Sequence, residues 1–125
     1  MKPKRKPQTD RDLELMFHCI NVHFFDKAIN PAIKCKYVPQ KELDKRSNHE
    51  DGADAMWCPM IGEIWIDEVY KRSQAMSTVL LLHEMAHAAL QDSYVGYPGN
   101  NQGHGMIYQA ELYRLFHAGA YDDIL

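Results

Sequence analysis

The sequence predicts a single α+β domain in which helices enclose a small sheet. Three observations lead to this prediction. Apolar residues recur at helical spacing near the N-terminus, three short strand-like segments lie between residues 32 and 67, and a long apolar segment without Pro or Gly covers residues 77–91. At 125 residues the chain is long enough to bury one hydrophobic core without disulfide support.

The first predicted helix runs from the Thr9 region to about Lys27. Thr9 followed three residues later by Asp12 is a helix-start pattern. An apolar stripe follows at spacings of three, four and seven residues, made by Leu13, Met16, Phe17, Ile20 and Phe24. This helix is expected to serve as scaffold.

Three short strands are predicted next. The segment "AIKCKYV" at 32–38 alternates apolar residues with lysines, which is typical of a half-buried strand. The charged stretch "QKELDKRSNHEDG" at 40–52 is predicted to be a loop. "ADAMWC" at 53–58 and "EIWID" at 63–67 are predicted to be two strands joined by the turn "PMIG".

The segment "STVLLLHEMAHAALQ" at 77–91 is predicted to be a buried helix with Ser77 as its N-cap. His83 and His87 lie four residues apart, so one helical face presents both imidazoles to a single point. Glu84 lies on the same turn. Three polar groups in an apolar helix would each cost ~1 to 3 kcal/mol if unsatisfied, and a bound metal would give all three a partner. The H-E-x-x-H pattern therefore predicts a Zn²⁺ site in which Glu84 takes a proton from a metal-bound water.

A third zinc ligand is expected further along the chain, because catalytic zinc sites usually hold three protein ligands. The familiar position six residues after the second histidine is occupied by Ser93. A predicted loop, "DSYVGYPGNNQGHG" at 92–105, then leads into a C-terminal helix predicted for 104–119, with Gly119 as its stop. His104 lies at that junction between two glycines, which would let the backbone bring its imidazole close to the metal.

These residues resemble those of the SprT-like zinc metalloproteases, to which the eukaryotic DNA–protein crosslink protease Spartan also belongs. The matching segments are "HEMAHA" at 83–88, "GHG" at 103–105 with the aromatic Tyr108 after it, and "NVHFFDKAINPAIKCKY" at 21–37. The resemblance covers roughly residues 10–118. It implies a minimal zincin-like fold, with a small three-stranded sheet over the H-E-x-x-H helix and a C-terminal helix that carries the third ligand. It also implies the zinc ligands His83, His87 and His104 and the general base Glu84.

The expected function is that of an intracellular zinc metalloprotease, a hydrolase that cleaves peptide bonds of protein substrates with a Glu-activated, metal-bound water. A peptide substrate is expected to add as a strand beside "EIWID". The transition-state oxyanion needs a donor, for which Tyr94, Tyr97 and Tyr108 are candidates.

Two other functions remain open at this stage. One is a zincin-fold binding module, for nucleic acid or a protein partner, in which the metal is structural. The other is a different intracellular H-E-x-x-H peptidase with an acidic third ligand, for which Asp92 and Glu111 are available.

Charge and composition limit the partners. The net charge of −3 does not favour a protein whose whole surface binds nucleic acid. Positive charges cluster only in residues 1–8, which we interpret as a flexible basic tail before a domain at 9–125, so DNA is expected to bind weakly. The chain also shows no C-terminal cysteine-rich zinc ribbon such as many SprT-like proteins use for DNA. No segment is predicted to span a membrane, and the N-terminus has no signal-peptide pattern, so a cytoplasmic location with reduced cysteines is expected.

Overall fold

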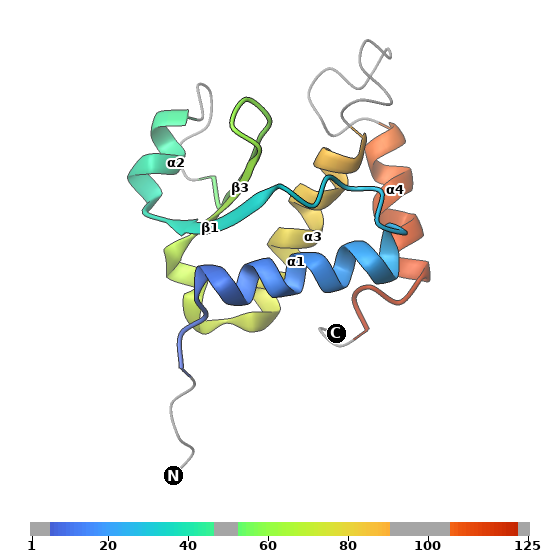
Figure 1. Ribbon diagram of the computed structural model, residues 1–125, viewed down its shortest axis with the longest axis horizontal. Helices are drawn as coiled ribbons and strands as arrows, with labels where there is room; N and C mark the ends of the chain where they lie inside the picture. The colour runs from blue at the N-terminus through green and yellow to red at the C-terminus, as the bar shows by residue number, and fades with distance from the viewer. Residues whose placement is uncertain (1–5, 47–52, 91–105, 123–125) are drawn as a thin grey trace.

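The computed structural model of the protein describes residues 6–46, 53–90 and 106–122. Its elements follow in the order α1 (Asp10–Phe24), β1 (Lys34–Val38), α2 (Gln40–Arg46), β2 (Ala55–Cys58), β3 (Glu63–Asp67), the 3-10 helix η1 (Glu68–Arg72), α3 (Gln74–Leu90) and α4 (Met106–His117). The predicted α+β class is confirmed (Figure 1). Among the described helices, none has the length and apolar character needed to cross a bilayer.

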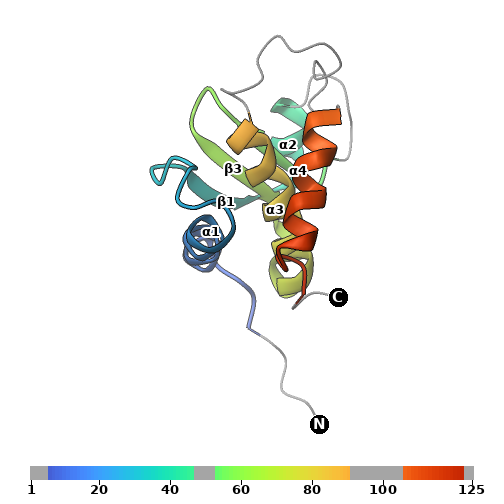
Figure 2. The same cartoon turned by 90° about the vertical axis from the view of Figure 1, so that its right-hand side faces the viewer.

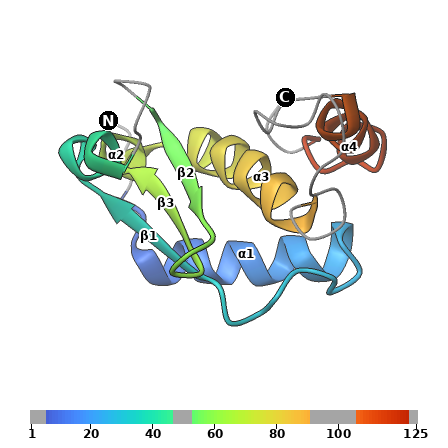
Figure 3. The ribbon, with the colours of Figure 1, turned by 90° about the horizontal axis from the view of Figure 1, so that it is seen from above.

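The sheet has three strands in the order β1-β3-β2, seen from above in Figure 3. β1 runs parallel to β3, and β2 runs antiparallel to it. The segment "EIWID" is therefore the central strand, and the prediction that a peptide could add beside it is wrong, because both of its edges are already paired. The two edges of the sheet belong to β1 and β2.

The edge of β1 is closed by acidic side chains of α1. The backbone N–H of Tyr37 donates to Asp10 Oδ1 at 2.9 Å, and the N–H of Cys35 donates to Glu14 Oε1 at 3.3 Å. Alternate residues of a strand direct their N–H groups to opposite sides. These two N–H groups are thus the ones that point away from β3, and α1 satisfies both.

The core lies between one face of the sheet and helices α1 and α3. Strand residues Cys35, Ile64 and Ile66 are at most 1% exposed, and they pack in one cluster with the helices. From α1 and α3 this cluster receives Leu13, Phe17, Leu81, Leu82 and Met85. Burying side chains of this size stabilises the fold by about 1.5 to 3 kcal/mol each. Helix α3 lies beside β2 (Figure 3) and is thereby fixed against the edge of the sheet.

Helix α1 begins as predicted and ends earlier than predicted. Thr9 and Asp12 form a reciprocal capping box, in which each side chain accepts a hydrogen bond from the backbone of the other. The helix ends at Phe24 instead of about Lys27, because Asp26 and Lys27 adopt left-handed backbone conformations with φ of 51° and 64°.

Residues 40–46 form the helix α2, where a loop was predicted, and this prediction is wrong. The segment is rich in good helix formers, and its Leu43 is fully buried. Pro39 stands just before the helix, and its carbonyl accepts from the N–H of Glu42 at 2.9 Å. The segment has one buried residue, Leu43, among charged ones, so its sequence shows no amphipathic pattern.

Helix α3 begins three residues earlier than predicted, at Gln74, so Ser77 is not its N-cap. Ser73 has that role, because its Oγ accepts from the N–H of Met76 at 3.2 Å. Ser77 is fully buried inside the helix. Its hydroxyl donates to the carbonyl of Tyr70 at 3.0 Å and lies 2.6 Å from the hydroxyl of Tyr37.

Helix α4 runs alongside α3 (Figure 2), and its Arg114 donates to the carbonyl of Phe24 at the end of α1 at 2.9 Å. Gly119 ends it as predicted, with φ of +90°. The N–H of Gly119 donates to Phe116 O at 3.2 Å, and the N–H of Ala120 donates to Leu115 O at 3.0 Å, which is the pattern of a Schellman motif.

Candidate functional site

Helix α3 presents His83, Glu84 and His87 next to the edge strand β2. Glu84 is 6% exposed, whereas both histidines are partly exposed. The Nε2 atom of His83 lies 3.9 Å from Glu84 Oε2. A buried carboxylate thus lies beside two imidazoles that solvent can reach, on one turn of one helix.

The spacing of the two imidazoles fits a shared metal ion. Their ring centroids are 5.1 Å apart. A Zn–N bond of about 2.1 Å places a ring centroid about 3.2 Å from the ion, and two such rings at a tetrahedral angle are about 5.2 Å apart. Two neutral imidazoles are also good ligands for zinc. The two histidines could therefore supply two of the three protein ligands of a catalytic zinc.

The carboxylate of Glu84 is held by the edge strand. The backbone N–H of Trp57 on β2 donates to it, but burial dominates and raises the pKa of Glu84 from its usual 4.5 to about 7. The strand register explains this contact. Asp67 N–H donates to Asp54 O at 2.9 Å, so the alternate residues Ala55 and Trp57 direct their backbone groups away from β3 and toward the site.

Tyr108 on α4 covers the two histidines from the other side. Its ring stacks on His87, with centroids 4.2 Å apart and planes inclined by 21°, and it meets His83 edge-on at 5.3 Å. Its hydroxyl donates to the backbone carbonyl of His83 at 3.0 Å. Burial, with a smaller effect from the charge of Glu84, raises the pKa of Tyr108, so the phenol remains a hydrogen-bond donor. The predicted role of Tyr108 as an oxyanion stabiliser stays a prediction.

Among the residues that the structure describes, none completes a group of three possible ligands with His83 and His87. Within 6–46, 53–90 and 106–122, no group of three His, Cys, Asp or Glu side chains could hold a metal. Four of the residues singled out from the sequence fall outside these ranges, namely Asp92, Tyr94, Tyr97 and His104.

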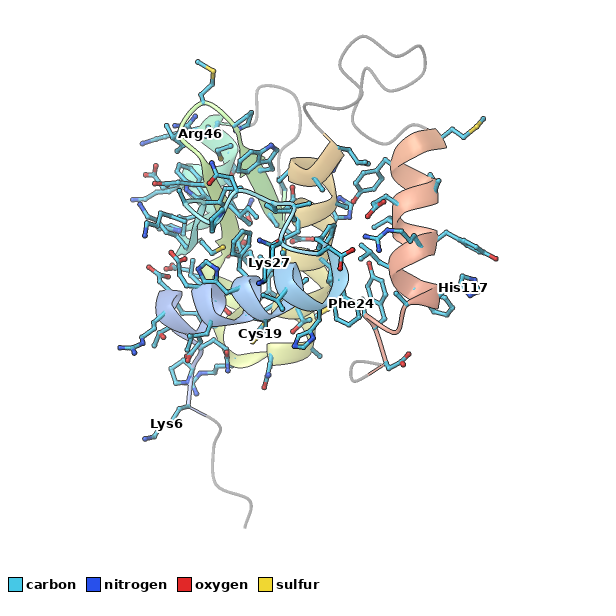
Figure 4. The ribbon with its side chains drawn as sticks, turned by 45° about the vertical axis from the view of Figure 1, so that its right-hand side comes forward. Lys6, Cys19, Phe24, Lys27, Arg46 and His117 are labelled. Carbon is cyan, nitrogen blue, oxygen red and sulfur yellow. The ribbon has the colours of Figure 1, made fainter. Side chains whose placement is uncertain are left out.

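Two other side chains of α4, those of Glu111 and His117, are of types that can bind a metal. Glu111 forms an ion pair with Arg114, whose Nε lies 3.0 Å from Glu111 Oε1. His117 is exposed at the end of the helix, on the outer side of the molecule in Figure 4. Neither belongs to a metal-binding group in the described part of the chain.

Two features of the site were not predicted from the sequence. The contact of Glu84 with Trp57 uses a backbone N–H, which leaves no mark in the residue types. The contacts of Tyr108 with His83 and His87 join residues 25 and 21 positions apart (108 − 83 and 108 − 87). The only signal for them was the aromatic residue that follows "GHG".

Comparisons of the chain with models of protein families, with curated proteins and with solved structures gave no match.

Proposed function

We propose that the protein is a zinc-dependent endopeptidase with a minimal zincin-like fold, similar to the SprT-like metalloproteases. The observation that carries the proposal is the buried Glu84 carboxylate beside two imidazoles spaced for one ion, at the edge of a sheet. Ionisation of the buried Glu84 carboxylate is unfavourable without a nearby positive charge. A divalent cation bound by the two imidazoles beside it would supply that charge.

His83, His87 and His104 would hold the zinc. His104 lies outside the described residues, and in the sequence it precedes Tyr108, whose ring stacks on His87, by four positions. When bound, zinc polarises the scissile carbonyl and makes a coordinated water more acidic.

Glu84 is the general base in this proposal. Its carboxylate accepts a proton from the attacking water and returns the proton to the leaving amine. The N–H of Trp57 holds the carboxylate in place during both transfers. A pKa of about 7 in the metal-free protein suits a group that takes up and releases a proton near neutral pH.

The substrate would be an extended peptide that pairs with β2. The other edge, β1, has its outward N–H groups bonded to Asp10 and Glu14, so it offers no free donors at these positions. On β2, the outward N–H of Trp57 donates to Glu84, so the outward backbone groups of Ala55 are the ones that a peptide would meet beside the site. Main-chain pairing there would place a peptide bond beside the carboxylate with little demand on side-chain identity.

The test compares four proteins for zinc content and for cleavage of an unfolded protein: wild type, Glu84→Gln, His104→Ala and His117→Ala. We expect Glu84→Gln to keep one zinc and to lose activity at least a hundredfold, since general-base catalysis contributes about 10² to 10⁴. His104→Ala should lose most of its zinc and all activity. His117→Ala, a control histidine on α4, should lose neither.

Three outcomes would contradict parts of the proposal. Activity of Glu84→Gln within a few-fold of wild type removes the base role from Glu84. Zinc retained by His104→Ala but lost by Asp92→Ala or Glu111→Ala supports the peptidase with an acidic third ligand. A wild type that binds zinc and cleaves nothing is the binding module.

A further inference from the structure

Tyr108 makes two separate contacts with the proposed metal ligands, and the proposed chemistry uses neither. It is 1% exposed and lies in the first turn of α4. The ring covers the face of His87 at 4.2 Å, and the hydroxyl binds the backbone carbonyl of His83 at 3.0 Å. One side chain therefore holds the imidazole of one histidine and the backbone of the other.

The two contacts restrict different motions. A stacked aromatic ring limits rotation of the His87 imidazole about its last side-chain bond, because rotation would drive the imidazole edge into the phenol ring. The hydrogen bond acts on the helix. The carbonyl of His83 is the one that normally accepts from the N–H of His87 in the helix ladder, so the phenol adds a second donor at the turn that carries both ligands.

We propose that Tyr108 is a positioning residue for the metal site, which holds the His87 imidazole by stacking and the ligand-bearing turn of α3 through its hydroxyl. This inference rests on the proposed zinc function. Groups that orient ligands without touching the metal commonly change metal affinity 10- to 100-fold when they are removed. Tyr108 meets this description for two ligands at once.

If Tyr108 had only a structural role, substitutions at this position would affect metal binding differently. Tyr108 belongs to the hydrophobic core, and a core residue is replaced with little change in function by another side chain that fills the volume. A positioning residue must also keep its specific contacts. The two roles are separated by variants that keep the ring and lose the hydroxyl, or that lose the ring.

The experiment measures zinc dissociation constants by competition with a chelator, and visible absorption spectra of the Co²⁺-substituted protein. The proteins are wild type, Tyr108→Phe, Tyr108→Leu and the control Tyr113→Leu, whose residue lies on the same helix and is 68% exposed. We expect Tyr108→Phe to bind zinc about 3- to 10-fold more weakly, and Tyr108→Leu about 10- to 100-fold more weakly with an altered Co²⁺ spectrum. Tyr113→Leu should match wild type in both measurements.

The outcomes separate this inference from the proposed function. If wild type binds zinc and both Tyr108 variants match its affinity and Co²⁺ spectrum, only the role of Tyr108 is overturned. If Tyr108→Leu does not fold, Tyr108→Phe decides alone, and an unchanged affinity and spectrum overturn the inference. If wild type binds neither zinc nor Co²⁺, the proposed function fails and the inference fails with it.

Discussion

Glu84 is the residue at which folding and the proposed function oppose each other most directly. Its carboxylate is 6% exposed on an apolar helix, and burial raises its pKa to about 7. A carboxylate in such a place is destabilising when it is ionised and no cation is bound. The group that suits a metal site is therefore a liability to the metal-free fold.

Glu84→Gln should accordingly make the metal-free protein more stable at pH 8. The cost of ionising Glu84 in the folded state is absent well below pH 4.5, where the carboxyl is protonated in the folded and the unfolded protein. It grows as the pH rises from 4.5 to about 7, because in this interval the unfolded protein loses the proton and the folded protein keeps it. We expect a gain of about 1 to 3 kcal/mol in the free energy of unfolding at pH 8. Urea denaturation in the presence of a chelator measures it.

Glu63→Gln is a control that should change the free energy of unfolding in the opposite direction, because the pKa of Glu63 is lowered and not raised. The indole N–H of Trp65 and, to a lesser extent, the ammonium of Lys36 bind the Glu63 carboxylate and lower its pKa. Its ionised form stabilises the fold above the unfolded pKa, and this contribution is lost as the pH falls through the folded pKa. Glu63→Gln should thus destabilise the protein at pH 8. If both substitutions changed the free energy of unfolding equally, burial would not be what determines the effect of the Glu84 charge on stability.

At the scale of elements, the two edges of the sheet differ in what they offer to another chain. Unpaired strand edges promote association, and proteins commonly block them. Here Asp10 and Glu14 of α1 bind the outward N–H groups of β1, whereas β2 faces the candidate site. The helix closes one edge, and the other serves the proposed peptide.

Opening the β1 edge should cause self-association. The double variant Asp10→Ala/Glu14→Ala leaves two strand N–H groups without their partners, which costs about 1 to 3 kcal/mol for each group that stays buried. We expect a lower free energy of unfolding and a sedimentation coefficient that rises with protein concentration.

Two controls separate hydrogen bonding from charge in this test. Glu42→Ala/Glu68→Ala removes the same charge from α2 and η1 and should sediment as the wild type does. Asp10→Asn/Glu14→Gln keeps an acceptor oxygen at each position and should restore most of the wild-type behaviour. Self-association of the charge-matched control to the same extent would assign the effect to net charge.

For the whole molecule, the sequence predicted the elements with clear periodicity and failed where structure depends on distant partners. Helix α1, the three strands and the helix with His83 and His87 follow from local patterns of apolar residues. Helix α2 was missed because its one buried residue, Leu43, lies among charged neighbours.

The arrangement of these elements could be predicted less well. The central place of β3 could not be predicted, since pairing joins residues far apart in the chain. In the candidate site, His83, Glu84 and His87 were evident from their spacing on one helix. The contacts of Tyr108 with the two histidines depend on how α4 packs against α3. The hydrogen bond from the Trp57 N–H to Glu84 depends on how β2 packs against α3.

The strand order β1-β3-β2 also predicts the order in which the strands pair during folding. β2 and β3 are joined by the four residues 59–62, and hairpins of this kind form in about 1 to 10 μs. The partners in the parallel pair, such as Lys34 and Glu63, are 29 residues apart (63 − 34), so β1 must close a much longer loop before it gains any contact. We therefore expect the hairpin to be formed in the folding transition state, and β1 with the α1 carboxylates to join it later. Stopped-flow φ-value analysis should give a higher value for Met56→Ala on β2 than for Cys35→Ala on β1, and the reverse ranking would mean that the sheet assembles from its parallel side.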